Sequence, residues 1–281
     1  MFNNTPPKIY VSEIPDAEID AIPANAVELT SGVDGYIVND TIDGLSRPDA
    51  DIPISRLAGA NASRISDSNI SERNIVFDII PLPNTDEGRE ALYNILPYDT
   101  TLRFFFEKGS KTVYIDGEVE KLSGKFKPGK PFAFQLSILC PFPWFQSVEL
   151  HQPKLVVGEN TLPYDGDVPA GFTLSVPPQL SPPLQGSVED LSLTIGGKTF
   201  AYEGIVRTPY ICTVPGRKKF LGTRSTAGNT MAPAFSTLAA SSEWVTISRG
   251  NTTLTVSCSE NTTEWFNRQN IFTYRDTYSG V

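Results

Sequence analysis

The sequence predicts a mainly β protein of two domains, an N-terminal β domain with one helix and a C-terminal β-sandwich. The first observation is composition, because 23 prolines and 21 glycines are spread over 281 residues. Such a distribution favours many short strands and turns over long helices. The second is an alternation of apolar and polar residues in several stretches, which is the period of a half-buried strand. The length suits two domains of ordinary size.

The first predicted elements are a strand over residues 73–80 and a helix over residues 87–96. Thr85 is a suitable N-cap for the helix, and the two acidic residues after it favour the positive end of the helix dipole. Pro97 ends the helix. One face of the helix carries an apolar stripe that we expect to pack on a sheet, formed by Ala91, Leu92, Ile95 and Leu96.

The clearest pattern is that of an antiparallel meander of three strands after the helix. Residues 101–106 are rich in β-forming side chains, and residues 113–119 and 132–140 alternate between apolar and polar positions. Turn signals at residues 108–110 and 128–129 separate the three segments. Strands joined by such short turns pair with their neighbours in the chain.

The sheet is expected to end where two prolines, Pro141 and Pro143, follow the last of these strands, because proline cannot continue a central ladder. We therefore place the domain boundary near Ser147, with an N-terminal domain over residues 1–146 and a C-terminal domain over residues 147–281.

The C-terminal domain is predicted to be a sandwich of short strands without a helix. Gly196-Gly197 is a favourable hairpin turn between two of these strands. The expected strands cover residues 172–176, 191–195, 198–202, 244–247, 252–258 and 271–274.

The charge and cysteine content exclude several classes of protein. A net charge of −9 disfavours a surface that binds nucleic acid. No stretch approaches the ~20 apolar residues of a membrane span, and residues 1–10 lack the apolar core of a signal peptide. Assembly in a reducing cytoplasm is therefore expected, with three buried thiols at Cys140, Cys212 and Cys258.

Candidate catalytic residues do not form a recognisable site. His151 is the only histidine, so a metal site with two imidazoles is excluded. Asp116, Glu118 and Glu120 share the polar face of one strand, where carboxylates ~7 Å apart can hydrolyse glycosides. Because the opposite face of that strand is apolar, we interpret the acidic face as solvent-facing. We expect no enzymatic activity, no cofactor and no metal.

Three further motifs resemble ligand sites without completing them. Residues 196–199 have the end of a P-loop, but Ser192 stands where that motif needs another glycine. Asp165-Gly166-Asp167 lacks the remaining ligands of a calcium loop and is interpreted as a turn. The basic run over residues 217–219 is interpreted as a surface loop.

Several motifs, taken in order, resemble the distal tail protein family of long-tailed (siphovirus-type) bacteriophages. The opening residues 42–48, 56–60 and 70–75 are similar to the family's glycine-containing turn followed by a strand that begins with arginine. The helix, the meander and the closing residues 135–145 follow. The pattern from Trp244 to Val281 is similar to the end of the family's second domain. The sequence departs from the family in its acidic opening before Gly35 and in an insert over residues 217–233.

The resemblance implies the architecture and the biology. The N-terminal domain would be a belt-type domain that forms a hexameric ring continuing the tail tube, and the C-terminal domain a galectin-like sandwich projecting outward. The implied partners are other copies of the chain, the tail tube protein, the tape-measure protein, and a tail-tip hub or receptor-binding protein. The implied location is the tail tip of the virion, assembled in the host cytoplasm, where DNA passes through without being bound.

Two functional roles can be assigned to particular residues, a lining of the ring's lumen and, in a competing interpretation, the binding of sugars. Before position 50 the chain has nine acidic residues against Lys8 and Arg47, and part of this stretch would line the lumen of the ring and repel DNA. Those acids are Glu13, Asp16, Glu18, Asp20, Glu28 and Asp34. The competing class is a carbohydrate-binding module acting through the second domain, with Trp244 and Trp265 stacking on sugars.

Overall fold

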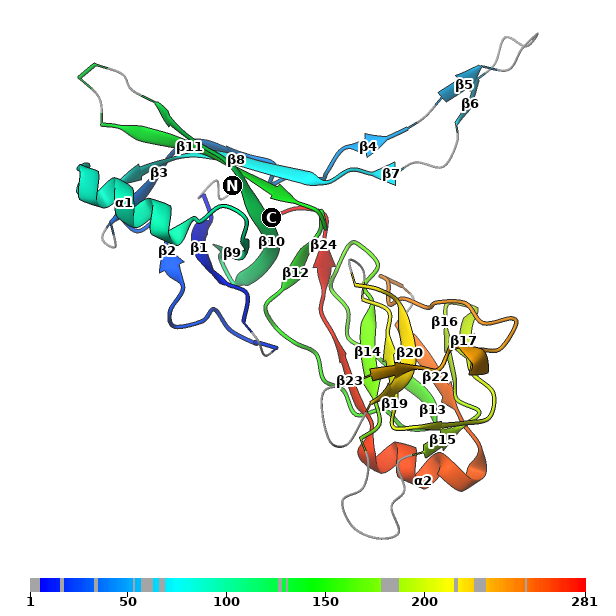
Figure 1. The fold of residues 1–281 in the computed structure, drawn as a ribbon. Helices are drawn as coiled ribbons and strands as arrows, with labels where there is room; N and C mark the ends of the chain where they lie inside the picture. Colours follow the sequence, from blue (N-terminus) through cyan, green and yellow to red (C-terminus); the bar gives the residue numbers. More distant parts are fainter. Residues whose placement is uncertain are drawn as a thin grey trace. The chain divides into compact units, whose positions relative to one another are not determined.

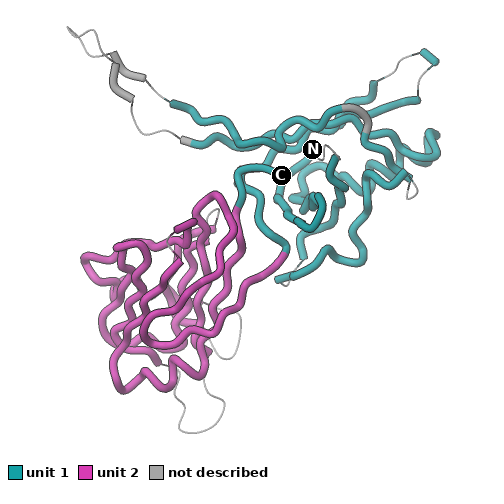
Figure 2. Tube along the Cα trace, turned by 180° about the vertical axis from the view of Figure 1, so that it is seen from behind, with its two compact units in different colours: residues 1–148, 278–281 teal, residues 149–277 magenta. Residues whose placement is uncertain are grey.

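The computed structural model describes residues 6–15, 18–32, 35–52, 54–56, 63–65, 69–125, 128–129, 131–177, 187–214, 217–224, 231–250 and 252–281. The chain forms two compact units (Figure 2). Unit 1 comprises Met1–Val148 and Tyr278–Val281, and unit 2 comprises Glu149–Thr277. The division lies two residues beyond the sequence-derived boundary, and the sequence did not indicate that the last four residues return to unit 1.

Unit 1 is built on an antiparallel sheet with the strand order β2-β1-β9-β10-β11-β8-β3 (Figure 1). The short strand β12 pairs with β10 and with β24, the strand by which the chain returns to unit 1. The bounds are β1 (Lys8–Glu13), β2 (Val27–Glu28), β3 (Tyr36–Asp43), β8 (Arg73–Pro81), β9 (Thr101–Lys108), β10 (Lys111–Lys125), β11 (Ala133–Cys140), β12 (Phe145–Ser147) and β24 (Thr277–Tyr278).

The predicted meander and helix of the first domain are confirmed. Strands β9, β10 and β11 pair in sequence order, and their apolar positions enter a core that includes Phe104, Ile115 and Leu136. Helix α1 (Asp86–Ile95) begins at Thr85, whose hydroxyl accepts from the Gly88 amide at 3.4 Å. Leu92 is buried in the same core, so the helix is held by tertiary packing, as its short length requires.

A hairpin of short strand pairs connects β3 to β8. Strand β4 (Ala50–Asp51) pairs with β7 (Asn69–Ile70), and β5 (Ile54–Arg56) pairs with β6 (Ser63–Ile65). Figure 1 shows β4 and β7 side by side beyond the end of the main sheet. Ile52 and Ile70 are exposed there. Apolar side chains in this position can contribute to a contact with another chain.

Unit 2 consists mainly of two antiparallel sheets around one core. The order β13-β22-β16-β17 defines a four-stranded sheet and β21-β20-β19-β14-β23 a five-stranded sheet. Leu193 and Val256 of the first sheet and Leu174 and Ile211 of the second lie in the same core, so the two sheets pack face to face. The bounds are β13 (Gly158–Thr161), β14 (Phe172–Ser175), β16 (Ser192–Ile195), β17 (Lys198–Ala201), β19 (Pro209–Cys212), β20 (Phe220–Arg224), β21 (Met231–Pro233), β22 (Thr253–Ser257) and β23 (Ile271–Tyr274).

Three smaller elements complete unit 2. Strands β15 (Ser187–Glu189) and β18 (Ile205–Arg207) form a separate pair, and η1 (Phe235–Thr237) is a short 3-10 helix. Helix α2 (Glu260–Gln269) lies between β22 and β23.

Two sequence-based expectations for unit 2 were wrong. The first is the absence of a helix, because α2 forms although its sequence, ENTTEWFNRQ, is polar and rich in poor helix formers. Burial of Trp265 and Phe266 in the core stabilises the helix instead. The second is a strand over residues 244–247. In that segment Ile247 forms only an isolated bridge with Ala170, although Val245 and Ile247 are buried as the apolar pattern suggested.

Candidate functional site

Of the six acidic residues expected to line a lumen, three are exposed on the surface of unit 1. Glu13, Glu18 and Asp20 are exposed, and Asp16 and Asp34 lie outside the described residues. Glu28 is half-buried and accepts a hydrogen bond from the Thr30 hydroxyl at 3.3 Å. Glu13, Glu18 and Asp20 therefore lie at the surface of unit 1.

The acidic opening segment covers the outer face of the meander. Ile19 and Ile22 pack against a small second cluster made by Phe105, Tyr114 and Val148. Tyr10 also joins this cluster, and its hydroxyl donates to Glu107 at 3.0 Å. Burial, followed by that hydrogen bond and the charge of Glu28, raises the pKa of Tyr10 to about 12. The segment is thus anchored by apolar contacts while its carboxylates stay at the surface.

The three acidic residues of β10 do not form a free carboxylate pair. Asp116 accepts two hydrogen bonds from Arg103, at 2.7 and 2.9 Å, and the guanidinium lies 3.9 Å from the centre of the Tyr114 ring. Burial lowers the pKa of Arg103, but its hydrogen bonds and neighbouring negative groups more than offset this and raise it. Glu118 accepts from Thr101, and Glu120 accepts from Asn74 and Ser137. This arrangement holds the sheet together and leaves no acid–base pair for glycoside hydrolysis.

Arg73, the first residue of β8, binds four main-chain carbonyls that belong to three distant segments of unit 1. Its Nε donates to Pro143 O at 2.7 Å and its Nη2 to Ser279 O at 2.7 Å. Its Nη1 donates to Gly44 O and to Ser46 O, both at 2.5 Å. The residue is only 3% exposed, and burial lowers its pKa to about 10. A planar guanidinium can satisfy several carbonyls at once, so Arg73 ties the C-terminal residues to the sheet.

Glycine is required beside this arginine. Gly44 has φ of 84°, and a Cβ there would lie 2.1 Å from Asn74 O. A side chain would therefore force the Gly44 carbonyl away from Arg73. The sequence analysis singled out the strand that begins at Arg73 and the turn that contains Gly44 as separate motifs. The hydrogen bond between them joins residues 29 positions apart, so the sequence did not indicate it.

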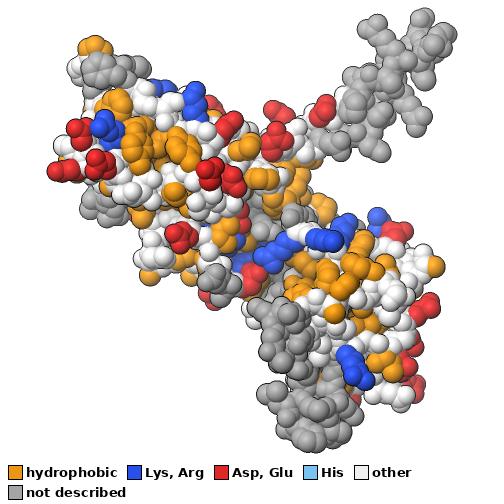
Figure 3. Space-filling model, viewed as in Figure 1, with side chains coloured by type: hydrophobic (Ala, Val, Ile, Leu, Met, Phe, Trp, Pro, Cys, Tyr) orange, Lys and Arg blue, Asp and Glu red, His pale blue; other side chains and the backbone are white. Residues whose placement is uncertain are grey.

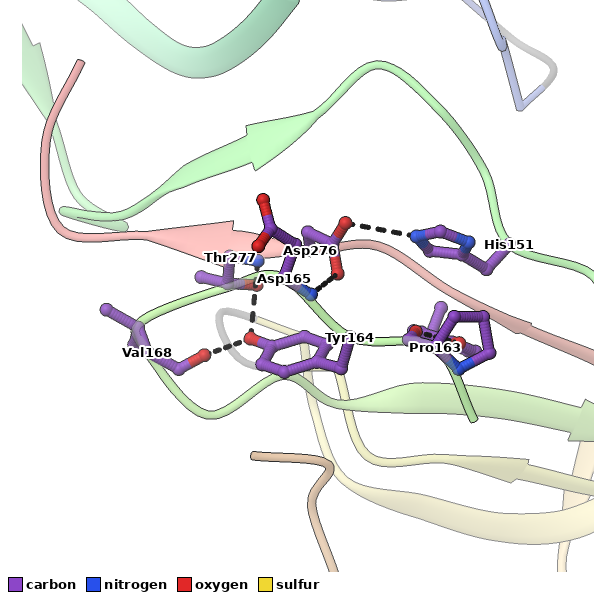
Figure 4. A network of polar contacts seen from close by, with 8 residues as sticks. His151, Pro163, Tyr164, Asp165, Val168, Asp276 and Thr277 are labelled. Atoms are coloured by element: carbon purple, nitrogen blue, oxygen red, sulfur yellow. Dashed lines mark hydrogen bonds and ion pairs between the residues drawn. The ribbon is translucent and has the colours of Figure 1, made fainter. Parts of the chain in front are cut away.

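His151 belongs to a polar network at the ends of unit 2 (Figure 4). Its Nε2 lies 3.1 Å from Asp276 Oδ2, and its ring stacks on Tyr274 at 4.8 Å between centroids. Asp276 Oδ1 accepts from the Asp165 amide at 3.0 Å. The Tyr164 hydroxyl donates to Val168 O. His151 lies near the start of unit 2, and Asp276 and Tyr274 lie near its end. The network therefore links the first residues of unit 2 to its last ones.

The two tryptophans expected to stack on sugars pack in the interior of unit 2. Trp265 is 8% exposed and belongs to the core. Trp244 is half-buried against the same core, with its ring 5.1 Å from the Phe200 ring. Neither position supports a sugar-stacking role for these residues. Within the described ranges, no group of three or more His, Cys, Asp or Glu residues could hold a metal ion, and no helix is long and apolar enough to cross a bilayer.

Comparison with known proteins gives a match of fold. No family model matches the chain, and neither does any curated protein. The crystal structure of the Dit protein (gp 19.1) of phage SPP1 is described as a paradigm of the hub adsorption apparatus in phages that infect Gram-positive bacteria. It aligns with a TM-score of 0.60 at 13% identity, covering 96% of this chain and 98% of that chain. The chain has the fold of a phage distal tail protein.

Two further structures share this fold. They are of the phage p2 baseplate in its activated conformation, one with Sr and one with Ca. Their TM-scores are 0.52 and 0.51, at 11% and 12% identity, and each alignment covers 98% of this chain and 99% of the matched chain. The fold class predicted from the sequence is thereby confirmed, and the resemblance seen in the sequence motifs extends to the fold.

Proposed function

We propose that the chain is a non-enzymatic structural subunit of a phage tail tip or baseplate. The observation that carries this proposal is the extent of the structural match, which covers both units in one order and nearly the whole of each chain. A single shared sandwich domain would align over only half of the length. The internal hydrogen bonding of Asp116, Glu118, Glu120 and His151 also favours a structural protein.

In this role unit 1 forms a ring of identical subunits, with six copies as the expected number. The strand order leaves β2 and β3 at the two edges of the main sheet, and an edge strand has unpaired main-chain groups available to a neighbour. Unit 1 also exposes several large apolar side chains, which an interface between copies would cover. These are Ile14, Ile37, Ile52, Ile70, Tyr93 and Tyr98.

The ring would join the tail tube to the host-recognition apparatus. Its expected neighbours are the tail tube protein, the tape-measure protein, and a tail-tip hub or receptor-binding protein. Labelling provides the test. Antibodies against unit 2 should decorate the tail tip of intact virions in electron micrographs, and decoration of the capsid, or of no part of the particle, would contradict the proposal.

The lumen of the ring is proposed to be acidic. Unit 1 has 13 Lys and Arg residues against 21 Asp and Glu residues, whereas unit 2 has ten against 11. Negative side chains repel the DNA backbone over about 8 Å at physiological salt, so Glu13, Glu18 and Asp20 would let DNA slide past. Replacing these three by lysine should slow DNA release from assembled particles. An assembled ring in which all three point away from the bore would contradict this role.

A further inference from the structure

The outward face of the five-stranded sheet in unit 2 carries a row of aromatic side chains. Strand pairing places Tyr210 opposite Gly222, and Cys212 opposite Phe220. The residues between them, Ile211 and Leu221, point into the core. Tyr210 and Phe220 therefore lie on the side of the sheet that faces away from the core.

These rings form a continuous row with a third aromatic residue. The Tyr210 and Phe220 ring centroids are 6.3 Å apart, and those of Phe220 and Phe235 are 5.8 Å apart. Phe235 is 41% exposed, and the other two are half-buried. A Cβ at Gly222 would lie 2.4 Å from Phe220 Cε1. The Phe220 ring thus occupies the space that a side chain at position 222 would need, and it meets the Phe235 ring edge-on, at an interplanar angle of 81°.

The same part of the chain is strongly basic. Residues 205–242 contain Arg207, Arg217, Lys218, Lys219 and Arg224 but no Asp or Glu, in a chain with a net charge of −9. Residues 217–219 and Arg224 are exposed. Burial raises the pKa of Tyr210, while the charges of Arg217 and Arg224 act to lower it, so both guanidiniums lie within electrostatic reach of its hydroxyl. Figure 3 shows an area of hydrophobic side chains on unit 2 bordered by Lys and Arg side chains.

We propose that this surface binds an anionic polysaccharide, a polymer whose sugar rings carry carboxylate or phosphate groups. We call it the aromatic–basic face, and it is made of Tyr210, Arg217, Lys218, Lys219, Phe220, Arg224 and Phe235. Aromatic rings offer flat apolar surfaces to the C–H faces of sugars, and Lys and Arg bind carboxylate and phosphate. Hydroxyl side chains continue the same face of the sheet across β14 and β23, at Thr173, Ser175 and Thr273.

Other occupants fit the composition less well. The centre of a protein–protein interface is depleted in charged residues and enriched in large anchors, whereas here basic side chains lie beside three rings, of which only Phe235 is exposed. A single-stranded nucleic acid would also use aromatic stacking and cations. The choice of a polysaccharide over a nucleic acid rests on the proposed function, because an adsorption apparatus meets the polymers of a cell surface.

Binding of purified full-length protein to five polymers tests the proposal. Polygalacturonate supplies sugar rings with carboxylates, and a phosphorylated mannan supplies rings with phosphates. Dextran has rings without charge, polyphosphate has charge without rings, and a thymidine oligomer represents single-stranded DNA. One or both anionic polysaccharides should bind at least about tenfold more tightly than the other three polymers, and more weakly as salt is raised. Equal or tighter binding of polyphosphate or the oligomer, or no binding of either anionic polysaccharide, would overturn it.

Two variants test whether the polymers bind at the aromatic–basic face. Phe235→Ala, and the double change Lys218→Ser with Lys219→Ser, should each weaken binding about tenfold. Both alter exposed side chains, and unchanged melting curves would show that the fold is intact. Matched controls are Val156→Ala, an exposed apolar residue of unit 2 in the segment before β13, and Lys198→Ser, an exposed lysine of unit 2 paired with Glu243. Parental affinity in both test variants, or an equal loss in the controls, would rule out this face. Ring assembly is measured separately by mass, so failure of one proposal does not imply failure of the other.

Discussion

Arg73 illustrates how one buried residue holds separate segments together. Its guanidinium is almost fully removed from water, and among the described residues it faces four main-chain carbonyls and no carboxylate. Burying a charge is costly unless its hydrogen-bonding groups are satisfied. The position is therefore stable only when residues 44–46, Pro143 and Ser279 are all in place.

Removing this side chain should destabilise unit 1. In Arg73→Met the four carbonyls lose their donor, and each buried unsatisfied group costs about 1–3 kcal/mol. We expect a loss of about 3 kcal/mol or more, measured by urea unfolding. Arg89→Met is the matched control, because Arg89 pairs with Asp86 at the surface and such pairs contribute at most about 1 kcal/mol. Equal losses in the two variants would show that the Arg73 contacts are not stabilising.

Buried tyrosines give the protein a defined response to alkali. Burial, chiefly, raises the pKa of Tyr164 from 10.0 to about 12, and that of Tyr10 reaches a similar value. Between these pH values the unfolded chain has lost protons that the folded chain keeps. The free energy of unfolding should therefore decrease as pH rises from 10 to 12. Phenolate absorbance measured against pH should show Tyr10 and Tyr164 ionising late. Ionisation of all ten tyrosines near pH 10 in the folded protein would contradict this expectation.

At the scale of elements, the sequence predicted those strands and helices whose formation depends on residues close together in the chain. Alternation predicted the meander, and Thr85 with Pro97 predicted α1, because pairing and capping act between residues close in the chain. The sequence did not indicate α2, whose stability comes from burying Trp265 and Phe266. Nor could it indicate the polar contacts of Arg73, which join residues more than 200 positions apart.

Asn270 completes α2 from outside the helix. Its Oδ1 accepts from the Leu155 amide at 3.1 Å, and its Nδ2 donates to Leu155 O and to Phe266 O. The residue is 3% exposed. Asn270→Ala should cost about 2–3 kcal/mol, because it leaves buried main-chain groups unpaired. Glu264→Ala, at an exposed position of the same helix, should change stability by less than about 0.5 kcal/mol. Urea unfolding compares the two, and similar effects would remove Asn270 as a determinant of α2.

At the scale of the whole molecule, unit 2 is inserted between two parts of unit 1. The returning residues are integrated into unit 1, where Tyr278 is buried under Lys111 at 3.1 Å from Nζ to the ring centre. The Val281 amide donates to Leu45 O at 3.1 Å. A cut between residues 146 and 147, the boundary expected from sequence, would therefore leave the first fragment without six residues of unit 1, namely residues 147–148 and 278–281.

Truncation after Thr277 should destabilise unit 1 while leaving unit 2 folded. The truncated chain loses the Tyr278 ring and the Ser279 carbonyl that accepts from Arg73. We expect two calorimetric transitions, with only that of unit 1 shifted to lower temperature. The variant Tyr278→Phe keeps the ring and the main chain, so its unit 1 transition should stay close to that of the parent. An unshifted unit 1 transition in the truncated chain would show that the C-terminal residues do not stabilise this unit.

The central claim, a ring of identical subunits at a phage tail tip, is tested most directly by the mass of the native assembly. Native mass spectrometry should be performed over a range of concentrations, alone and with tail fractions from lysed host cells. The account predicts a closed oligomer, six times 30.7 kDa for the expected hexamer, that dissociates when Tyr93 and Tyr98 are replaced by glutamate. A chain that stays monomeric under all of these conditions would contradict it.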